Sequence, residues 1–175
     1  MGAALAGRGD LAAAPGVTEI RPIDLADEAT AAAVVALQRE AYAVEAALIG
    51  SDGIPALTES AEAVRAAGED WIGAADDDGL VGAVSWRELA DRTIDIHRLV
   101  VAPRAFRRGI ATALLDALDE RFPDRPMVVS TGRDNAPARE LYARRGFVVV
   151  REREVVPGLW IAEHARPAAR ELTRD

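Results

Sequence analysis

One segment of the sequence, residues 95–115, restricts the fold more than any other. It reads DIHRLVVAPRAFRRGIATALL; its first half alternates like a β-strand, and its second half repeats apolar residues at helical spacing. Between the halves stand Arg107, Arg108 and Gly109, where the helix is predicted to begin. The positive end of the helix dipole disfavours arginines at that place. Their presence therefore calls for a negatively charged partner or for exposure to solvent.

The start of this predicted helix is suited to bind a phosphate. The first N–H groups of a helix have no partner inside it, and a glycine lets the backbone approach a ligand closely. Arg107 and Arg108 would add charge-assisted hydrogen bonds to the same anion. A P-loop is excluded, because the Gly-Lys-Ser/Thr ending is missing. From this segment alone, an exposed loop whose arginines only aid solubility explains the residues equally well.

The rest of the pattern predicts one α/β domain with a mixed sheet. A chain of 175 residues suits one core, and an early strand meander followed by a β-α-β unit implies a mixed sheet. Residues 1–16 are expected to form a disordered extension, residues 17–165 the domain and residues 166–175 a loose tail. Strands are predicted at 17–23, 70–76, 80–89, 92–101, 126–131, 148–155 and 159–164, and helices at 27–50, 58–68, 109–122 and 135–147.

Composition narrows the classes of function. The net charge of −8 argues against a general nucleic-acid binder. With no cysteine and two histidines, a disulfide framework or a metal site is not expected. No apolar run reaches the roughly 20 residues of a membrane helix, so a cytoplasmic protein is the expectation. Residues 1–90 carry 16 acidic residues against 5 arginines, whereas residues 91–175 carry 13 against 16. This difference fits an anion partner for the second half and a cation partner for the first, but an uneven distribution of solvated surface charge explains it equally well.

A second segment, STGRDNAPARELYARRGF over residues 130–147, makes the functional interpretation of the first segment more specific. Asn135 is placed as a helix N-cap, Pro137 lies in the first turn, and Gly146 is placed as the glycine that ends the helix. Asn135 and Tyr142 share a helical face. Alone, Tyr142 is more often a half-buried packing residue than a catalyst, but the phosphate-binding loop upstream changes that balance.

At these residues the sequence resembles the GNAT superfamily of acyl-CoA-dependent N-acyltransferases. RLVVAPRAFRRGIATALLDAL is similar to its motif A, and residues 130–147 are similar to its motif B, with Leu141, Tyr142, Gly146 and Phe147 as the LY-x-x-x-GF signature. The resemblance covers residues 18–163 in element order, although only residues 94–147 are specific. It implies the GNAT fold: a central, mostly antiparallel sheet with one splayed parallel pair and flanking helices.

The resemblance also implies the reaction and its cofactor site. An amine would attack acetyl-CoA directly in a ternary complex, and Tyr142 would protonate the departing thiolate. The family loop commonly begins with Gln or Arg where this chain has Phe106, so Arg107 or Arg108 would replace that contact. The residues expected to bind acetyl-CoA are Leu99, Val100, Val101, Arg107, Arg108, Gly109, Ile110, Ala111, Thr112, Asn135 and Tyr142, with no metal.

The amine must also lose a proton, because a lysine-like ammonium has a pKa of about 10.4. Candidates for the base are Asp95 and His97 on the strand before the loop, with Glu88 on the previous strand. A packed His97 and an exposed Asp95 would explain those two residues equally well. Alternation places Ile94, Ile96 and Arg98 on one face of the strand and Asp95, His97 and Leu99 on the other.

The acceptor and the partners are less defined by the sequence. Tyr42 and Glu45 lie where the family builds its acceptor pocket, so with Glu88 and His97 they are expected to bind the substrate. The acceptor would be a small-molecule or peptide amine, neither nucleic acid nor membrane is an expected partner, and a homodimer stays open. The alternative function is a catalytically inactive acyl-CoA-binding or regulatory domain.

Overall fold

A computed structural model describes residues 19–50 and 54–168 of the chain. The extension predicted at residues 1–16 lies outside the described residues. The elements, in chain order, are β1 (Glu19–Pro22), α1 (Glu28–Ile49), the 3-10 helix η1 (Pro55–Leu57), α2 (Ala61–Ala66), β2 (Asp70–Asp76), β3 (Gly79–Glu88), β4 (Ile94–Val101), the 3-10 helix η2 (Pro103–Ala105), α3 (Ile110–Arg121), β5 (Met127–Gly132), α4 (Ala136–Arg144), β6 (Val148–Val156) and β7 (Leu159–Arg166).

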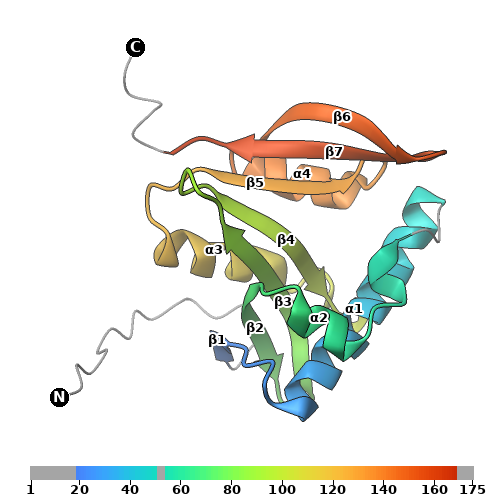
Figure 1. Ribbon diagram of the computed structural model, residues 1–175, viewed down its shortest axis with the longest axis vertical. Coiled ribbons are helices and arrows are strands. Elements are labelled where there is room, and N and C mark those ends of the chain that lie inside the picture. The colour runs from blue at the N-terminus through green and yellow to red at the C-terminus, as the bar shows by residue number, and fades with distance from the viewer. Residues whose placement is uncertain (1–18, 51–53, 169–175) are drawn as a thin grey trace.

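The described strands form a seven-stranded sheet in the order β1-β2-β3-β4-β5-β7-β6. The pair β4–β5 is parallel and the other neighbouring pairs are antiparallel, which confirms the predicted mixed sheet. Pairing of β4 with β5 is limited to Ile94–Ile96 and Met127–Val129. Beyond these residues the two strands diverge, and Figure 1 shows β5, β7 and β6 as a group set off from β1–β4. The sheet therefore opens in its middle.

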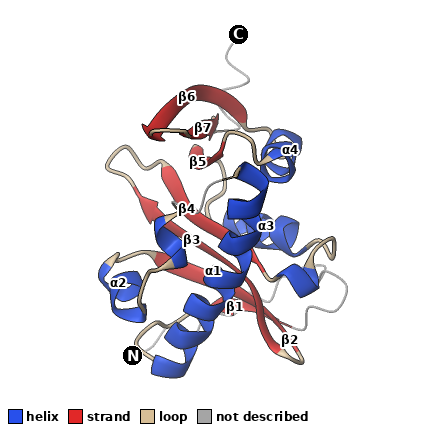
Figure 2. Ribbon diagram, turned by 90° about the vertical axis from the view of Figure 1, so that its right-hand side faces the viewer, coloured by secondary structure: helices blue, strands red, loops and turns tan. Residues whose placement is uncertain are grey.

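Helices cover both faces of the larger group of strands (Figures 1 and 2). Helix α3 packs on β2, β3 and β4, and a side chain at Gly82 would collide with Ile110. Helix α1 packs against β3 and β4 and against α2. Its predicted apolar stripe is buried at Val34 and Leu37, but Leu48 is 52% exposed. The last turns of α1 thus project beyond the sheet toward the place where β4 and β5 separate.

Strand β4 contains a bulge that corrects one expectation from the sequence. Trp86 of β3 pairs with Ile96, whereas Ser85 pairs with Arg98, so His97 is the extra residue. Cross-strand partners share a face and neighbouring residues alternate. Because Trp86 and Ser85 point to opposite faces, Ile96 and Arg98 do so as well. The prediction that Arg98 shares a face with Ile94 and Ile96 is therefore wrong.

The bulge directs the side chain of Arg98 toward a cluster of acidic and amide side chains beneath α1 and α2. Arg98 pairs with Glu59 and Glu69, with Nε 2.9 Å from Oε2 of Glu69, and donates to Oε1 of Gln38 at 3.1 Å. Its guanidinium also lies 5.6 Å from the ring centroid of Trp71. This cluster ties α1 and the segment around α2 to β4. Breaking such an enclosed pair leaves an uncompensated charge.

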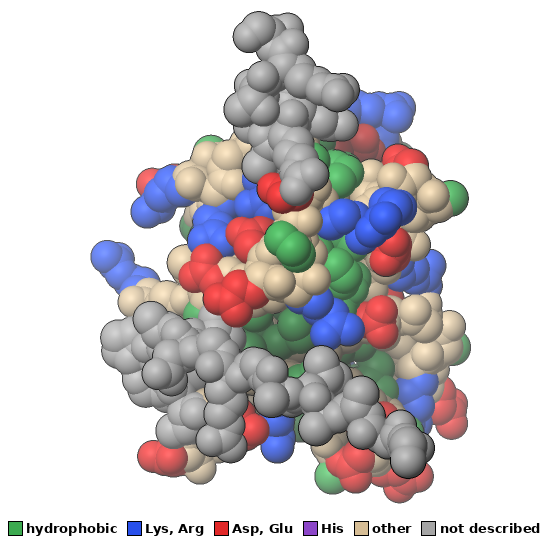
Figure 3. Space-filling view, turned by 90° about the vertical axis from the view of Figure 1, so that its left-hand side faces the viewer, with side chains coloured by type: hydrophobic (Ala, Val, Ile, Leu, Met, Phe, Trp, Pro, Cys, Tyr) green, Lys and Arg blue, Asp and Glu red, His purple; other side chains and the backbone are tan. Residues whose placement is uncertain are grey.

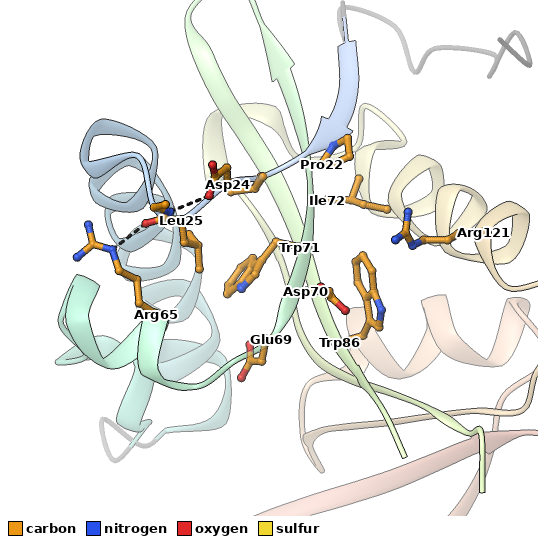
Figure 4. A pocket seen from close by; sticks show the side chains of 12 residues that line it. Pro22, Asp24, Leu25, Arg65, Glu69, Asp70, Trp71, Ile72, Trp86 and Arg121 are labelled. Carbon is orange, nitrogen blue, oxygen red and sulfur yellow. Dashed lines mark hydrogen bonds between the residues drawn. The ribbon is translucent and has the colours of Figure 1, made fainter. Parts of the chain in front are cut away.

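A hollow of about 460 Å³ lies beside this cluster, at the start of β2. Figure 4 shows Trp71 and Trp86 on opposite sides of the sheet, with Glu69 near Trp71 and Arg121 of α3 near Trp86. Arg65 of α2 donates from Nε to the Leu25 carbonyl at 2.7 Å. These contacts join α2, the segment before α1 and the sheet edge. The hollow shares no residue with the place where β4 and β5 separate.

The C-terminal boundary differs from the prediction. Strand β7 continues through Arg166, which was assigned to a loose tail. Arg166 pairs with Asp119 of α3 and donates to the Arg145 carbonyl at 3.2 Å. Ala168 is also buried, so the packed part of the domain extends past residue 165. The rest of the predicted tail, residues 169–175, lies outside the described residues.

Positive and negative side chains are interspersed on the face shown in Figure 3. The charge difference between the two halves of the sequence thus produces no single-sign surface on the visible part of that face. Among the residues that the structure describes, no helix is both long and apolar enough to cross a membrane.

Candidate active site

A cleft of about 590 Å³ opens where β4 and β5 diverge. Its walls are the end of β4, the loop and first turn of α3, one side of α4 and the last turns of α1. Leu99, Val100 and Val101 lie beyond the part of β4 that pairs with β5, so that edge of the strand faces the cleft. Of the eleven residues expected to bind the cofactor, all except Arg108 line this cleft.

The N-terminus of α3 forms an anion-binding surface at the cleft wall. Gly109 is the N-cap at φ 76°, and no side chain caps the helix. The N–H groups of Ile110, Ala111 and Thr112 therefore have no partner within the helix. Arg107 also adopts a positive φ, 62°, a conformation that is uncommon outside glycine. Together these residues leave backbone donors available to a phosphate.

The two arginines of the loop, grouped together in the sequence, have different surroundings. Arg107 lines the cleft. Arg108 does not, and its Nη1 lies 3.0 Å from Oδ2 of Asp76 in β2. The sequence reasoning treated the pair as interchangeable because the partner of Arg108 is 32 residues away. Only Arg107 is positioned to contact a molecule in the cleft.

Two further arginines line the cleft from α4 and were missed by the sequence reasoning. Arg145 pairs with Asp116 and Asp119 of α3, with N–O distances of 2.5 and 2.7 Å. Arg144 lies 2.7 Å from Glu140 on the exposed side of α4. The segment ARRGF shows these two arginines in the sequence, but it does not show that α4 approaches α3. With Arg107, they make three cations along one cleft.

On the other side of the gap between the strands lies a smaller cavity of about 240 Å³. Most of its wall is apolar, and its ionisable groups are Glu45, His97 and two tyrosines. The sequence reasoning named Tyr42, Glu45 and His97 but not the apolar wall, because the wall comes from elements far apart in the chain. The apolar lining residues are Ile49, Ile54, Leu99, Val129, Ala138, Val155, Leu159 and Ile161.

The cleft and the cavity meet at a set of shared residues, which we call the junction. Tyr142 in the junction is 4% exposed, and burial raises its pKa above the ordinary value near 10, with further contributions from Tyr42 and Glu45. Its ring packs against Phe147 and His164, with centroids 5.7 and 5.5 Å away. The residues that line both hollows are Tyr42, Glu45, Leu99, Asn135, Ala138 and Tyr142.

Two polar residues of the junction accept hydrogen bonds from neighbouring segments. The carboxylate of Glu45 faces the end of β5, with Oε1 3.4 Å from the Gly132 nitrogen and 3.3 Å from Oγ1 of Thr131. The Asn135 side chain accepts from the Ala138 N–H at 3.2 Å, as expected of an N-cap. Asn135 is therefore held as the start of α4, at the boundary between the two hollows.

The predicted base candidates lie in different places. His97 lines the cavity, with Nε2 3.2 Å from Asp95 and Nδ1 3.5 Å from Glu69, whose carboxylate is 3% exposed. Asp95 lines neither hollow. Glu88 also lines neither and lies 2.9 Å from Arg125. The structure thus brings Asp95 and His97 together and leaves Glu88 apart.

Among residues 19–50 and 54–168, no group of three or more His, Cys, Asp or Glu side chains is arranged to hold a metal ion.

Comparison with known proteins gives a family match. The model of the Acetyltransferase (GNAT) family matches residues 32–147. The chain is 36% identical over 130 residues to UPF0157 protein YqkA of Bacillus subtilis (strain 168), covering 74% of this chain and 38% of that protein. It is 38% identical over 134 residues to mycothiol acetyltransferase of Geodermatophilus obscurus, covering 73% of this chain and 41% of that protein. The chain therefore spans about two fifths of these relatives.

A solved structure shows the same fold. It is the PaiA N-acetyltransferase of Thermoplasma acidophilum in complex with coenzyme A, with a TM-score of 0.64 and 20% identity. The match covers 83% of this chain and 96% of that one.

Proposed function

Because the chain belongs to the acetyltransferase (GNAT) family, we propose that it transfers an acetyl group from acetyl-CoA to a primary amine. The observation that carries the proposal is the junction, where a cation-lined cleft meets a cavity that contains a carboxylate. A thioester and an amine can meet at one point only if their binding sites share a wall, and the buried hydroxyl-bearing ring of Tyr142 belongs to that wall. Coenzyme A in the PaiA neighbour supports the nature of the donor.

The cleft fits the donor by its chemistry. The unpartnered N–H groups at the start of α3 and the side chain of Arg107 would bind the pyrophosphate. The edge of β4 at Leu99–Val101 would hold the pantetheine arm by backbone hydrogen bonds and polarise the acyl carbonyl. Asn135 supports this arrangement from the start of α4.

The reaction then needs three proton movements. The neutral amine nitrogen attacks the thioester carbonyl, the N–C bond forms and the C–S bond breaks. The departing thiolate takes its proton from Tyr142, whose raised pKa keeps it protonated at neutral pH. The ammonium loses its proton beforehand to the pair formed by Asp95 and His97, through water at the cavity wall. The nitrogen of the adduct then gives up a second proton, which restores Tyr142, so the products are the amide, the free thiol and one proton released to solvent.

A thiol-release assay with acetyl-CoA and a broad panel of amines tests this function. We expect turnover in the native protein and a fall in kcat of about 10²- to 10⁴-fold for Tyr142→Phe, because general acid catalysis contributes about that much. Binding of CoA, measured by calorimetry, should be retained in the variant. Tight CoA binding without turnover on any amine would instead favour the inactive acyl-CoA-binding domain.

A further inference from the structure

The two hollows differ in charge in a way that bears on the acceptor. Arg107, Arg144 and Arg145 line the cleft, but no arginine of the described part of the chain lines the cavity, and the sequence contains no lysine. Among the described residues that line the cavity, Glu45 is the one carboxylate. A positive group that enters the cavity would therefore find a counter-ion, and a negative group would find none.

His97 does not change this balance. Its two ring nitrogens face the carboxylates of Asp95 and Glu69, at 3.2 and 3.5 Å. Both ring nitrogens of His97 are thus engaged by negative groups of the protein. It would be a poor partner for a carboxylate of the substrate.

Glu45 is well placed to bind an ammonium at the reacting point. It lies in the junction, so a cation bound to it is adjacent to both the cavity and the thioester. Its contacts with Thr131 and Gly132 are long, 3.3 and 3.4 Å, and both involve Oε1. A carboxylate can accept about four hydrogen bonds, so acceptor sites are left for an ammonium.

Gly132 keeps this side of the cavity open. A Cβ atom at Gly132 would lie 2.9 Å from Cγ2 of Ile49 and 3.5 Å from Oε1 of Glu45. Any side chain there would displace Ile49 from the cavity wall or press on the carboxylate. The glycine therefore preserves the space beside the ammonium position.

The remaining wall sets the size and polarity of what the amine is attached to. Aliphatic side chains from α1, β4, β5 and the β6–β7 hairpin surround the cavity. Its volume is about 240 Å³. It suits an apolar group of that size, because burying apolar surface is favourable and burying an unpaired charge is costly.

We propose that the acceptor is a monoamine with a compact apolar body and no carboxylate, and that Glu45 binds its ammonium. This inference rests on the proposed acetyl transfer and names the class of its acceptor. Free amino acids are disfavoured because their carboxylate would enter a cavity that already holds Glu45. Polyamines are disfavoured because their second ammonium would be buried in the apolar wall.

The test compares phenethylamine, phenylalanine and spermidine as acceptors at saturating acetyl-CoA. We expect kcat/KM for phenethylamine to exceed the other two by at least about tenfold, the ratio that about 1.4 kcal/mol produces. The proposal is overturned if phenylalanine or spermidine is used as well or better. Absence of thiol release with every amine of the panel would contradict the acetyl transfer itself, which separates the two failures.

The role of Glu45 is tested with Glu45→Gln, which keeps the shape and removes the charge. We expect KM for phenethylamine to rise about 10- to 100-fold, since hydrogen bonds to charged groups contribute about 1.5–3 kcal/mol. Inhibition by 2-phenylethanol, which has the same body without the ammonium, should be unchanged. Glu40→Gln, on the exposed side of the same helix and outside both hollows, is the matched control. Equal weakening of amine and alcohol would overturn the assignment.

Discussion

The cleft and the cavity lie on either side of the same pair of diverging strands, yet they are built by opposite means. The cleft draws on backbone groups at the end of β4 and the start of α3, which are close in the sequence, and on arginines. The cavity draws on side chains from four distant parts of the chain, most of them aliphatic. The backbone part of the donor site can therefore be predicted from a continuous motif, whereas the acceptor site forms only in the folded protein.

This difference is clearest at Arg107, where we expect the largest change in the affinity for acetyl-CoA. Arg107→Ala should raise KM for acetyl-CoA about 10- to 100-fold, because a charge-assisted hydrogen bond contributes about 1.5–3 kcal/mol, while KM for the amine stays the same. Steady-state kinetics with each substrate varied in turn measures both. Arg108→Ala is the matched control, since Arg108 pairs with Asp76 outside the cleft, and it should affect KM for acetyl-CoA much less. Equal effects of the two variants would contradict the separation of the arginines.

The local origin of the cleft explains which parts of it the sequence predicted. The strand, loop and helix of residues 94–121 follow from periodicity and from Gly109, and the structure confirms these elements. The different surroundings of Arg107 and Arg108 do not follow, because Asp76 reaches the loop only through the register of β2 and β3. The local sequence pattern shows where a charged residue lies in the chain, but the tertiary contacts determine which group it pairs with.

A glycine behind the cleft offers a second way to separate the two hollows. A Cβ atom at Gly82 would lie 2.6 Å from Cγ2 of Ile110, the first residue of α3. Gly82→Ala should lower the free energy of unfolding by about 1–3 kcal/mol, the usual range for overpacking, and should weaken acetyl-CoA binding more than amine binding. Chemical denaturation and calorimetry with CoA measure the two effects. A stable variant with unchanged CoA affinity would show that α3 tolerates displacement.

The register of β4 shows most clearly what sequence periodicity cannot reveal. Strict alternation placed Arg98 with the buried isoleucines, but the extra residue at His97 reverses the faces beyond it. A bulge depends on how two strands pair, and β3 and β4 are joined through a turn whose sequence does not specify that register. The same bulge sets the ring of His97 at the cavity wall. The wall residues Ile54, Val155 and Leu159 could not be predicted for a related reason, because each belongs to a segment that reaches the cavity only through the fold.

A substitution of Gly132 tests the cavity in the same way as the Gly82 substitution tests the cleft. Gly132→Ala would bring a methyl group within 2.9 Å of Cγ2 of Ile49 at the cavity wall. We expect KM for the amine to rise about tenfold, which corresponds to about 1.4 kcal/mol, with KM for acetyl-CoA unchanged. The two glycine variants should therefore have opposite kinetic signatures. If Gly132→Ala instead raised KM for acetyl-CoA, the division of the site into a donor cleft and an acceptor cavity would be wrong.

The smallest expected effect concerns His164, which lies behind the junction and should not distinguish the two hollows. Burial lowers the pKa of His164 below its ordinary value of 6.5, and within the described part of the chain Nε2 has no hydrogen-bond partner. The unfolded chain thus binds a proton near pH 6.5 that the folded protein binds only at lower pH. Stability is then fully present above pH 6.5 and decreases as the pH falls from 6.5 through the folded pKa.

Thermal unfolding at a series of pH values checks this in the native protein and in His164→Gln. We expect the melting temperature of the native protein to fall more steeply than that of the variant below pH 6.5, because the variant has no group at this position that gains a proton. His97 is present in both proteins, so its contribution cancels in the comparison. Because the His164 ring packs on Tyr142, the native protein should also lose kcat in that range, with the KM values of donor and acceptor changing together. Parallel melting curves for the two proteins would contradict the lowered pKa of His164, and a change confined to one KM would contradict a shared wall behind the two hollows.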